Sequence, residues 1–466
     1  MRCILVLSLV ALLFPMGVES KAQEKAYRLA TFTADVTPPI GHPCMGGGIK
    51  PVEKIGDSLF ANGFVLLFPS SATPLPQGAR GDIKPIVVVA IDWCEIRNDA
   101  YERWRTVLAE AAQTDKERVL VTALHQHDAP IADLEAQRLL ESVKAKGNIC
   151  VLDFHEKAVQ RVAKALTKSL KEPTKITHFG IGQAKVEKVA SNRRYLDDGG
   201  AVRFNRMSAT RDPKIRAAED GVIDPWLKTL SFWDGDRPVL ALSAYATHPM
   251  SYYGTGVVTA DFVGLARKRR LNDDGSIMQM YVTGCAGNVT AGKYNDGAAD
   301  NRPILADRIY VAMVEAWKQT KRHPITDVQF RSEKLRLEPR EGPGFSVADL
   351  RKKMETDARP FNQCLAALGL SWRKRADAGA TIDVPALSFG KAHLVLLPAE
   401  AYVEYQLIAQ KTRPDSFVFV MGYGECGPGY IPTEQAVRER DGNLHDWNWI
   451  APGAEERIGA VLKKVL

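Results

Sequence analysis

The order of apolar and helix-like segments along the chain predicts an α/β fold with at least partly parallel strands. Short apolar segments that are typical of buried strands occur at Phe60–Phe68, Ile86–Ile91, Arg118–Ala123, Leu227–Trp233, Pro238–Ala246, Met278–Thr283, His393–Leu397 and Ser416–Met421. Segments that are typical of helices occur at Asp99–Gln113, Glu156–Leu170, Phe262–Leu271, Ile304–Gln319, Val347–Thr356 and Glu400–Lys411. Apolar residues make up 45% of the sequence, which is enough for a sizeable core. Segments 69–84 and 338–345 are predicted to be loops.

The first 22 residues have the composition of a secretory signal peptide. Arg2 supplies a positive start, the segment from Ile4 to Val18 is almost entirely apolar, and Ala22 ends a small-residue cleavage site. The alternative, a membrane anchor, is disfavoured because this apolar segment is short for a membrane span. We therefore expect cleavage near Ala22 and export of residues 23–466 to a secreted or periplasmic location, as one large domain or two.

The charge balance excludes some classes of partner. The formal net charge is +7, and removal of residues 1–22 would leave +6. The charges are dispersed and no basic stripe is interleaved with aromatic residues, so nucleic acid is not an expected partner. A basic surface still permits peripheral contact with anionic membranes or polysaccharides.

The cysteines give no framework for a metal cluster. Six of them follow the signal segment, namely Cys44, Cys94, Cys150, Cys285, Cys364 and Cys426. An even number permits disulfides in an exported chain, and the alternative is that some are buried small apolar residues. Because the motif Cys-x-x-Cys is absent, a zinc cluster of thiolates is not expected.

Two of the strand candidates end next to histidines. His125 and His127 follow Arg118–Ala123, and His248 follows Pro238–Ala246. Side chains two residues apart on an extended chain share a face, so His125 and His127 could face one site. Ligands in α/β proteins gather beyond the carboxyl ends of strands, and imidazole is the commonest zinc ligand. The pattern indicates a metal-dependent hydrolase, and the alternative is a set of hydrogen-bonded or exposed histidines.

Three further polar clusters follow strand or loop ends. The glycine-rich segment 284–292 lets backbone amides approach a ligand closely, but a plain turn is the alternative. Glu400 follows His393–Leu397, where the dipole of a helix would equally favour a carboxylate. Tyr430 lies in a loop rich in glycine and proline, where packing is the alternative role. The shared placement of these clusters supports a common site.

Taken in order, the motifs resemble the neutral (alkaline, non-lysosomal) ceramidase family, specifically its catalytic N-terminal domain. The motifs are ADVTPPIG at 34–41, DSLFANGFVLL at 57–67, TALHQHDAP at 122–130, SNRRY at 191–195, ATHPMSYYGTGVVTADFVG at 246–264, and later GCAGNVTAG, LLPAE and GYIPT. The resemblance covers nearly the whole mature chain. It implies one large catalytic domain over residues 23–466, with mixed β-sheets flanked by helices.

The resemblance also implies a set of functional residues. A single zinc ion, Zn2+, would be held by His125, His248, Glu400 and Tyr430. His127 would face the substrate rather than the metal, and Arg193 would contact the substrate near the reacting amide. Thr290 stands where the family usually has a serine, and the resemblance places it among the catalytic residues together with His127, Arg193 and His445.

Several positions depart from the family pattern. Gln126 and Asp128 replace a threonine and a serine of the first histidine motif. The segment 441–447 lacks the tyrosine that polarises the substrate carbonyl in the family, and His445 is the candidate substitute. The chain is also too short for the family's C-terminal immunoglobulin-like domain, which helps to shape lipid access. The resemblance thus predicts zinc-dependent hydrolysis more specifically than it predicts the substrate.

The sequence therefore predicts a secreted zinc-dependent hydrolase that cleaves an N-acyl amide bond in a small molecule or a lipid, with sphingolipid metabolism as the implied context. Zinc would generate a hydroxide nucleophile at neutral pH. Arg193, His127 or amides near Gly287 could stabilise the oxyanion, and His127 or His445 could protonate the leaving amine. The alternatives are a two-metal amidohydrolase on a closed barrel and a non-catalytic secreted protein that binds lipid or glycan on the same scaffold.

Overall fold

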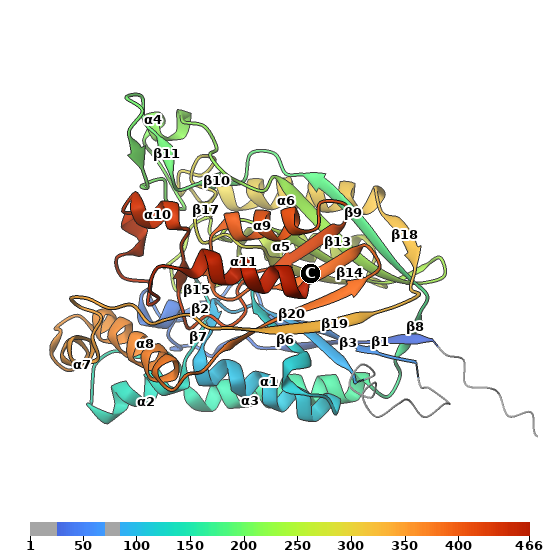
Figure 1. Cartoon of the computed structure of the whole chain (residues 1–466), viewed down its shortest axis with the longest axis horizontal. Coiled ribbons are helices and arrows are strands. Elements are labelled where there is room, and N and C mark those ends of the chain that lie inside the picture. Colours follow the sequence, from blue (N-terminus) through green and yellow to red (C-terminus); the bar gives the residue numbers. More distant parts are fainter. Residues whose placement is uncertain (1–25, 70–83) are drawn as a thin grey trace, which may run out of the picture.

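Three open β-sheets surround a common apolar centre, and helices cover their outer faces (Figure 1). The computed structural model describes residues 26–69 and 84–466. The first sheet has the order β6 (Val119–Ala123), β4 (Ile86–Ile91), β3 (Phe60–Leu67), β1 (Tyr27–Asp35) and β8 (Thr174–Ile176). The second has the order β16 (Met278–Thr283), β14 (Arg237–Tyr245), β13 (Trp226–Asp234), β9 (His178–Lys185) and β18 (Lys321–Pro324). The third has the order β19 (Gln329–Leu335), β20 (Ile382–Phe389), β21 (Ala392–Leu396) and β23 (Phe417–Met421).

A pair of helices packs on the outer face of each sheet. The pairs are α1 (Asn98–Ala112) with α3 (Leu152–Ser169), α5 (Asp261–Asp273) with α6 (Asn301–Lys318), and α9 (Val403–Thr412) with α11 (Ala454–Val465). A further group beside α1 consists of α2 (Leu134–Ser142), α7 (Val347–Thr356) and α8 (Pro360–Asp377), and the short helices are α4 (Pro213–Ala217) and α10 (Glu434–Arg438). In α3, Phe154, Ala158 and Val162 recur every four residues and form a buried stripe, as expected for a helix on a sheet.

Two-residue strands form small ribbons, several of them towards the left of Figure 1. Within the described part of the chain the pairs are β2 (Lys54–Ile55) with β15 (Val257–Val258), β5 (Glu95–Ile96) with β7 (Ile131–Ala132), β10 (Ser191–Asn192) with β17 (Val289–Thr290), β11 (Tyr195–Leu196) with β12 (Val202–Arg203), and β22 (Glu400–Ala401) with β24 (Tyr430–Ile431). These ribbons belong to the loops that follow or connect the long strands.

Each large sheet ends in one parallel pair, which is β4 with β6, β14 with β16, and β21 with β23. A parallel pair is usually covered on both faces and therefore reads as a continuous apolar segment. In β4, Val87 and Val89 pack towards the helices, whereas Val88 and Ala90 pack into the centre between the sheets. This double burial explains why these strands were readily identified in the sequence.

The carboxyl ends of the three parallel pairs are joined by hydrogen bonds. Ala123 N donates to Tyr423 O at 3.0 Å, and Gly422 N donates to Thr283 O at 2.8 Å. The Thr283 hydroxyl donates to Leu124 O at 2.7 Å. One strand end from each sheet is therefore fixed at a common point, where the loops that follow the strands meet.

The predicted α/β class with mixed sheets and flanking helices is confirmed. The eight predicted strands and six predicted helices are all present. The strands Ile86–Ile91 and Met278–Thr283 and the helix Val347–Thr356 have the predicted ends, and the ends of the others are shifted. One prediction is wrong in its local structure: Glu400 does not open a helix but lies on β22, and α9 begins at Val403. The position of Glu400 is therefore set by strand pairing rather than by a helix dipole.

Other sequence predictions concern the cysteines, the signal segment and the loop at 69–84. All six cysteines of the described residues are buried and unpaired, so they act as small apolar side chains there. The signal segment, residues 1–22, and most of the loop lie outside the described residues. Among residues 26–69 and 84–466, no helix has both the length and the apolar character that a membrane span requires.

His155 is a buried histidine that the predicted site does not use. Its ring lies 6.1 Å from the ring of Trp93 and 6.1 Å from that of Trp104. Both ring nitrogens are buried and have no hydrogen-bond partner among the described residues. Burial lowers the pKa of His155 to about 4, below the value of about 6.5 for an exposed histidine. His155 is therefore neutral in the folded chain over most of the acidic range.

We expect this burial to weaken the fold as the pH falls from about 6.5 to about 4. In that window the unfolded chain binds a proton at His155 and the folded chain does not, whereas above it both states are neutral. His155→Phe keeps a ring and removes the titration, so its free energy of unfolding should fall less on acidification, by up to about 3 kcal/mol. Urea denaturation at a series of pH values measures this, and parallel profiles for the two proteins would contradict it.

Candidate metal centre

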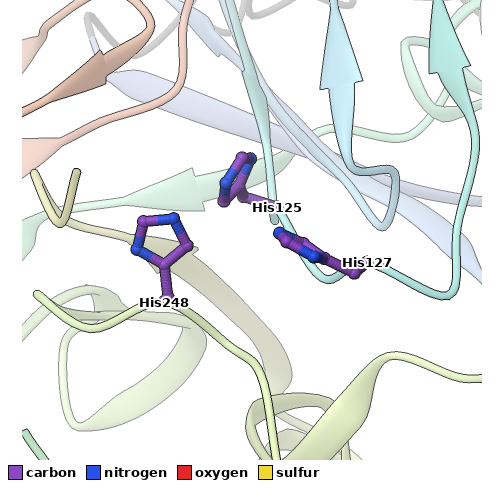
Figure 2. Close-up of side chains that lie close together, drawn as sticks. All are labelled: His125, His127 and His248. Atoms are coloured by element: carbon purple, nitrogen blue, oxygen red, sulfur yellow. The ribbon is translucent and has the colours of Figure 1, made fainter. Parts of the chain in front are cut away.

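His125 and His248 enter the same space from the ends of two different sheets (Figure 2). Their ring centroids are 4.8 Å apart, and both side chains are buried. The backbone of His125 turns out of its strand with φ of 73°, an uncommon conformation for a residue with a side chain. Such backbone strain occurs often at functional sites, because the surrounding structure must hold it in place.

Each of these rings is oriented by a backbone carbonyl. His125 Nδ1 lies 3.0 Å from Cys94 O, and His248 Nδ1 lies 2.6 Å from Ala286 O. A carbonyl oxygen only accepts, so Nδ1 carries the proton in both rings, and Nε2 of the neutral ring presents a lone pair. Both Nε2 atoms can thus act as electron-pair donors to a ligand.

Both Nε2 atoms face the same carboxylate oxygen. Glu400 Oε2 lies 3.1 Å from His125 Nε2 and 3.0 Å from His248 Nε2. His125 Nε2 is buried and has no well-oriented hydrogen bond. The two Nε2 atoms and Glu400 Oε2 are therefore three electron-pair donors that face one another. Because the neutral rings carry no proton on Nε2, they cannot donate a hydrogen bond to the carboxylate, and a divalent cation would bind all three atoms. Nitrogen and carboxylate oxygen are ligands that zinc accepts in tetrahedral sites.

The electrostatics of these side chains also favour a positive charge at this position. Burial opposes ionisation of Glu400, but His125 and His248 hold the pKa of its carboxyl well below the usual range. Burial also opposes protonation of His125, and Glu400 overcomes this and raises its pKa. Burial and the neighbouring Arg193 lower the pKa of His248 to about 4. Without a metal, His125 would have to supply the positive charge.

Tyr430 and Arg193 complete the buried cluster. Tyr430 lies beside Glu400 because β22 and β24 pair in parallel with these two residues in register. Arg193 Nη1 donates to the Tyr430 hydroxyl at 2.7 Å, and its Nη2 lies 3.4 Å from His248 Nε2. The Tyr430 oxygen and His248 Nε2 are thus held by one guanidinium. The four residues that the resemblance assigned to zinc lie together in the structure.

His127 is half-buried, whereas His125 and His248 are buried, and Figure 2 shows its ring beside that of His125. Its ring centroid is 5.5 Å from that of His125 and 6.3 Å from that of His248. Ligand atoms of these three histidines lie within 4.8 Å of one another, so His127 could either bind the metal or face the substrate. Burial, followed by the charges of His125 and His248, lowers the pKa of His127 far below its ordinary value. Its Nδ1 atom is buried without a hydrogen-bond partner.

The structure does not bring Thr290, His445 or the amide of Gly287 into this cluster. The Thr290 hydroxyl donates to Met207 O at 3.0 Å. The His445 side chain is 85% exposed and pairs with its neighbour Asp446. Gly287 N donates to Ala401 O at 3.0 Å, so this amide is already engaged. The roles predicted for these groups find no support in their contacts.

The two substitutions in the first histidine motif have structural partners. Gln126 Nε2 donates to Asp92 O at 2.5 Å, and Asp128 Oδ1 accepts from Gly254 N at 2.9 Å. Both side chains are buried. They support the surrounding backbone, so these departures from the family pattern leave the cluster intact.

Two residues beside His125 were not identified from the sequence. Tyr423 stacks on the His125 ring with a centroid distance of 4.1 Å. The Glu95 carboxylate lies 3.9 Å from His125 Nδ1, and its oxygens accept from Arg97 at 2.6 Å and from the Trp447 indole at 3.2 Å. Glu95 lies on the Nδ1 side of the His125 ring, away from Nε2. Because both of its carboxylate oxygens already have partners, we assign it a supporting role rather than a second metal site. Both residues closely follow predicted strands, so the strand-end rule could have found them.

The fold of this chain is similar to that of two solved structures. Neutral ceramidase from Pseudomonas aeruginosa superimposes with a TM-score of 0.67 at 18% sequence identity, over 95% of this chain and 74% of that chain. A ceramidase complexed with C2 superimposes with a TM-score of 0.67 at 16% identity, over 95% of this chain and 75% of that chain. The chain has the neutral ceramidase fold. No protein-family model and no curated protein sequence matches it.

The neutral ceramidase fold confirms, at the level of structure, the resemblance inferred from the motifs. At such low identity the likeness shows the fold alone, so the roles of individual residues rest on the geometry of this chain. That geometry gathers His125, His248, Glu400 and Tyr430 at the joined strand ends. Their assignment as zinc ligands stays a prediction.

Proposed function

We propose that this chain is a zinc-dependent hydrolase of N-acyl amide bonds. The observation that supports it best is the convergence of His125 Nε2, His248 Nε2 and Glu400 Oε2 in a buried position that needs a cation. These three residues and Tyr430 would hold the ion. The chemistry that zinc supplies when bound is Lewis acidity, which activates water for attack near neutral pH.

Arg193 and His127 would act on the reacting groups. Burial opposes the charge of Arg193, but its contact with Tyr430 raises the pKa of the guanidinium, so Arg193 stays a cation. That fixed charge would stabilise the negative charge that develops on the carbonyl oxygen. His127 is neutral at physiological pH and can take a proton from the attacking water and pass it to the departing amine. The net reaction consumes one water and releases a carboxylic acid and an amine.

The proposed substrate class is an N-acyl amide of a lipid or a smaller molecule. Both similar structures are ceramidases, which supports amides of the ceramide type as one member of this class. A lipid substrate would bring the chain into peripheral contact with membranes and into sphingolipid metabolism.

A substrate screen with and without metal tests the proposed function. Zinc-loaded and zinc-stripped protein would be assayed with a short-chain fluorescent ceramide, N-acyl amino acids, N-acyl sugars and simple esters. We expect the zinc-loaded protein to hydrolyse at least one amide and the stripped protein to hydrolyse none. No turnover by zinc-loaded protein would favour the alternative of a non-catalytic lipid- or glycan-binding protein.

The two-metal alternative has less support. The three large sheets of the described residues are open, with distinct edge strands, whereas that alternative required a closed barrel. Glu95, the one further carboxylate grouped with His125 and Glu400 in the described residues, already has partners on both oxygens. One metal per chain is therefore the proposed stoichiometry.

Export is part of the proposal and has its own test. The charged start at Arg2, the apolar segment and the small residues before Gln23 motivate cleavage after Ala22. Sequencing the amino terminus of protein recovered outside the cytoplasm should give Gln23 or a residue close to it. Protein that begins at Met1 and stays in the membrane fraction would contradict this prediction.

A further inference from the structure

The loop that follows His248 places an aromatic side chain against His127. Tyr253 is 39% exposed, and its ring centroid lies 4.7 Å from that of His127 with an interplanar angle of 70°. Among the described residues, Tyr253 is the one aromatic residue in the set of large apolar side chains that are exposed. An aromatic ring is therefore left open to solvent directly beside the group that would face the substrate.

Buried polar groups hold the backbone on both sides of Tyr253. After it, Gly254 N donates to Asp128 Oδ1 at 2.9 Å. Before it, Arg302 Nη2 donates to Tyr252 O at 2.6 Å, and the Arg302 guanidinium lies 3.8 Å from the centre of the Tyr252 ring. A surface that is fixed in advance binds more tightly because less conformational freedom is lost on binding. The position of Tyr253 is thus built into the loop.

The charged groups around this loop are already engaged. Arg302 Nη2 lies 3.3 Å from Asp261 Oδ2, and Asp128 accepts from the loop itself. The neighbour on the other side is the His127 ring, whose centroid lies 4.7 Å from that of Tyr253. What Tyr253 offers a ligand is therefore the face and edge of an aromatic ring, which favour another flat, uncharged ring.

We infer that Tyr253 determines specificity, selecting amides that carry an uncharged ring, aromatic or pyranose, beside the scissile bond. The inference rests on the proposed hydrolase function and deepens it. Tyr253 would contact a part of the substrate that does not react, so its contribution would be equal in the ground state and the transition state. Loss of such uniform binding raises KM and leaves kcat unchanged.

Three amides that share one acyl chain test this inference. Zinc-loaded protein would be assayed with the N-hexanoyl amides of glucosamine, benzylamine and hexylamine. Tyr253→Ala should raise KM for the preferred ring amide by about 3- to 10-fold with kcat retained, and change the hexylamide less than about twofold. Tyr253→Phe should behave as wild type because the ring face is kept. Comparison of the two ring amides shows whether the preferred ring is a sugar or an aromatic group.

The hydrogen bond from Gly254 N to Asp128 Oδ1, which holds the loop after Tyr253, provides a matched pair of variants. Asp128→Asn keeps an oxygen that accepts from Gly254 N and should keep the ring preference, whereas Asp128→Ala should lose it while zinc content is unchanged. Equal effects of Tyr253→Ala on all three amides, or no ring preference in wild type, would overturn the inference. Equilibrium titration with the same amides tests the preference without turnover, so that failure of hydrolysis alone is distinguished from failure of the ring preference.

Discussion

Replacement of Glu400 by glutamine is expected to remove bound zinc and abolish hydrolysis. The amide has the shape of the carboxylate but lacks the charge that lies 3.1 Å from His125 Nε2 and 3.0 Å from His248 Nε2. Loss of a supporting contact to a metal ligand already costs 10- to 100-fold in affinity, so loss of a ligand should cost more than about 100-fold. His248→Ala should have the same effect on zinc.

Metal analysis after dialysis, together with thermal unfolding, measures this expectation. Wild type should retain one zinc per chain, and Glu400→Gln should retain almost none while still unfolding cooperatively. His323→Ala is the control, because His323 lies exposed on β18, outside the cluster. Two metals per chain in wild type, or unchanged zinc content in both ligand variants, would show that the ion is held elsewhere.

The histidines of this site could be predicted from local sequence, and the structure shows why. His125 follows a strand that is buried throughout, and His248 follows a strand whose last six residues are buried, so both strands stand out as apolar segments. Parallel strands bring their carboxyl ends to the same edge of a sheet, which makes a polar residue at such an end informative. This rule identifies each histidine separately, whereas their meeting depends on how the first and second sheets pack together.

Glu400 and Tyr430 required the family resemblance as well. They are neighbours because β22 pairs with β24, a contact between segments 30 residues apart that no local pattern encodes. The sequence alone favoured a helix at Glu400, since the segment after it is helical and a carboxylate is common at that position. The pairing of β22 with β24 overrode this preference for helix at Glu400 and Ala401, and the helix begins at Val403.

The residues that hold the candidate zinc ligands in place were the hardest to predict from the sequence. Glu95 is a buried carboxylate whose partners, Arg97 and Trp447, come from near and far in the chain. A glutamate in such a position has no compositional signature, and charged residues are rarely buried unless they are paired. His445, by contrast, was singled out by residue type, but its side chain is exposed, and the contact from that segment to Glu95 is made by the indole of Trp447.

Replacement of His127 by alanine is expected to separate catalysis from metal binding. Zinc would already have His125, His248, Glu400 and Tyr430 as partners, so the variant should retain one zinc per chain. Its kcat should fall about 10²- to 10⁴-fold, the range typical of a lost acid–base group. The motivation is that the His127 ring lies next to both histidine ligands, yet its Nδ1 has no partner and its environment keeps it neutral.

His125→Ala is the matched comparison, because the two histidines share one loop but differ in their contacts. His125 Nε2 faces Glu400, whereas the ring of His127 packs against Tyr253 at the solvent side. His125→Ala should therefore lose both zinc and activity, whereas His127→Ala should keep zinc and lose activity. Loss of zinc from both variants would make His127 a metal ligand, and the proton transfer assigned to it would then require another group.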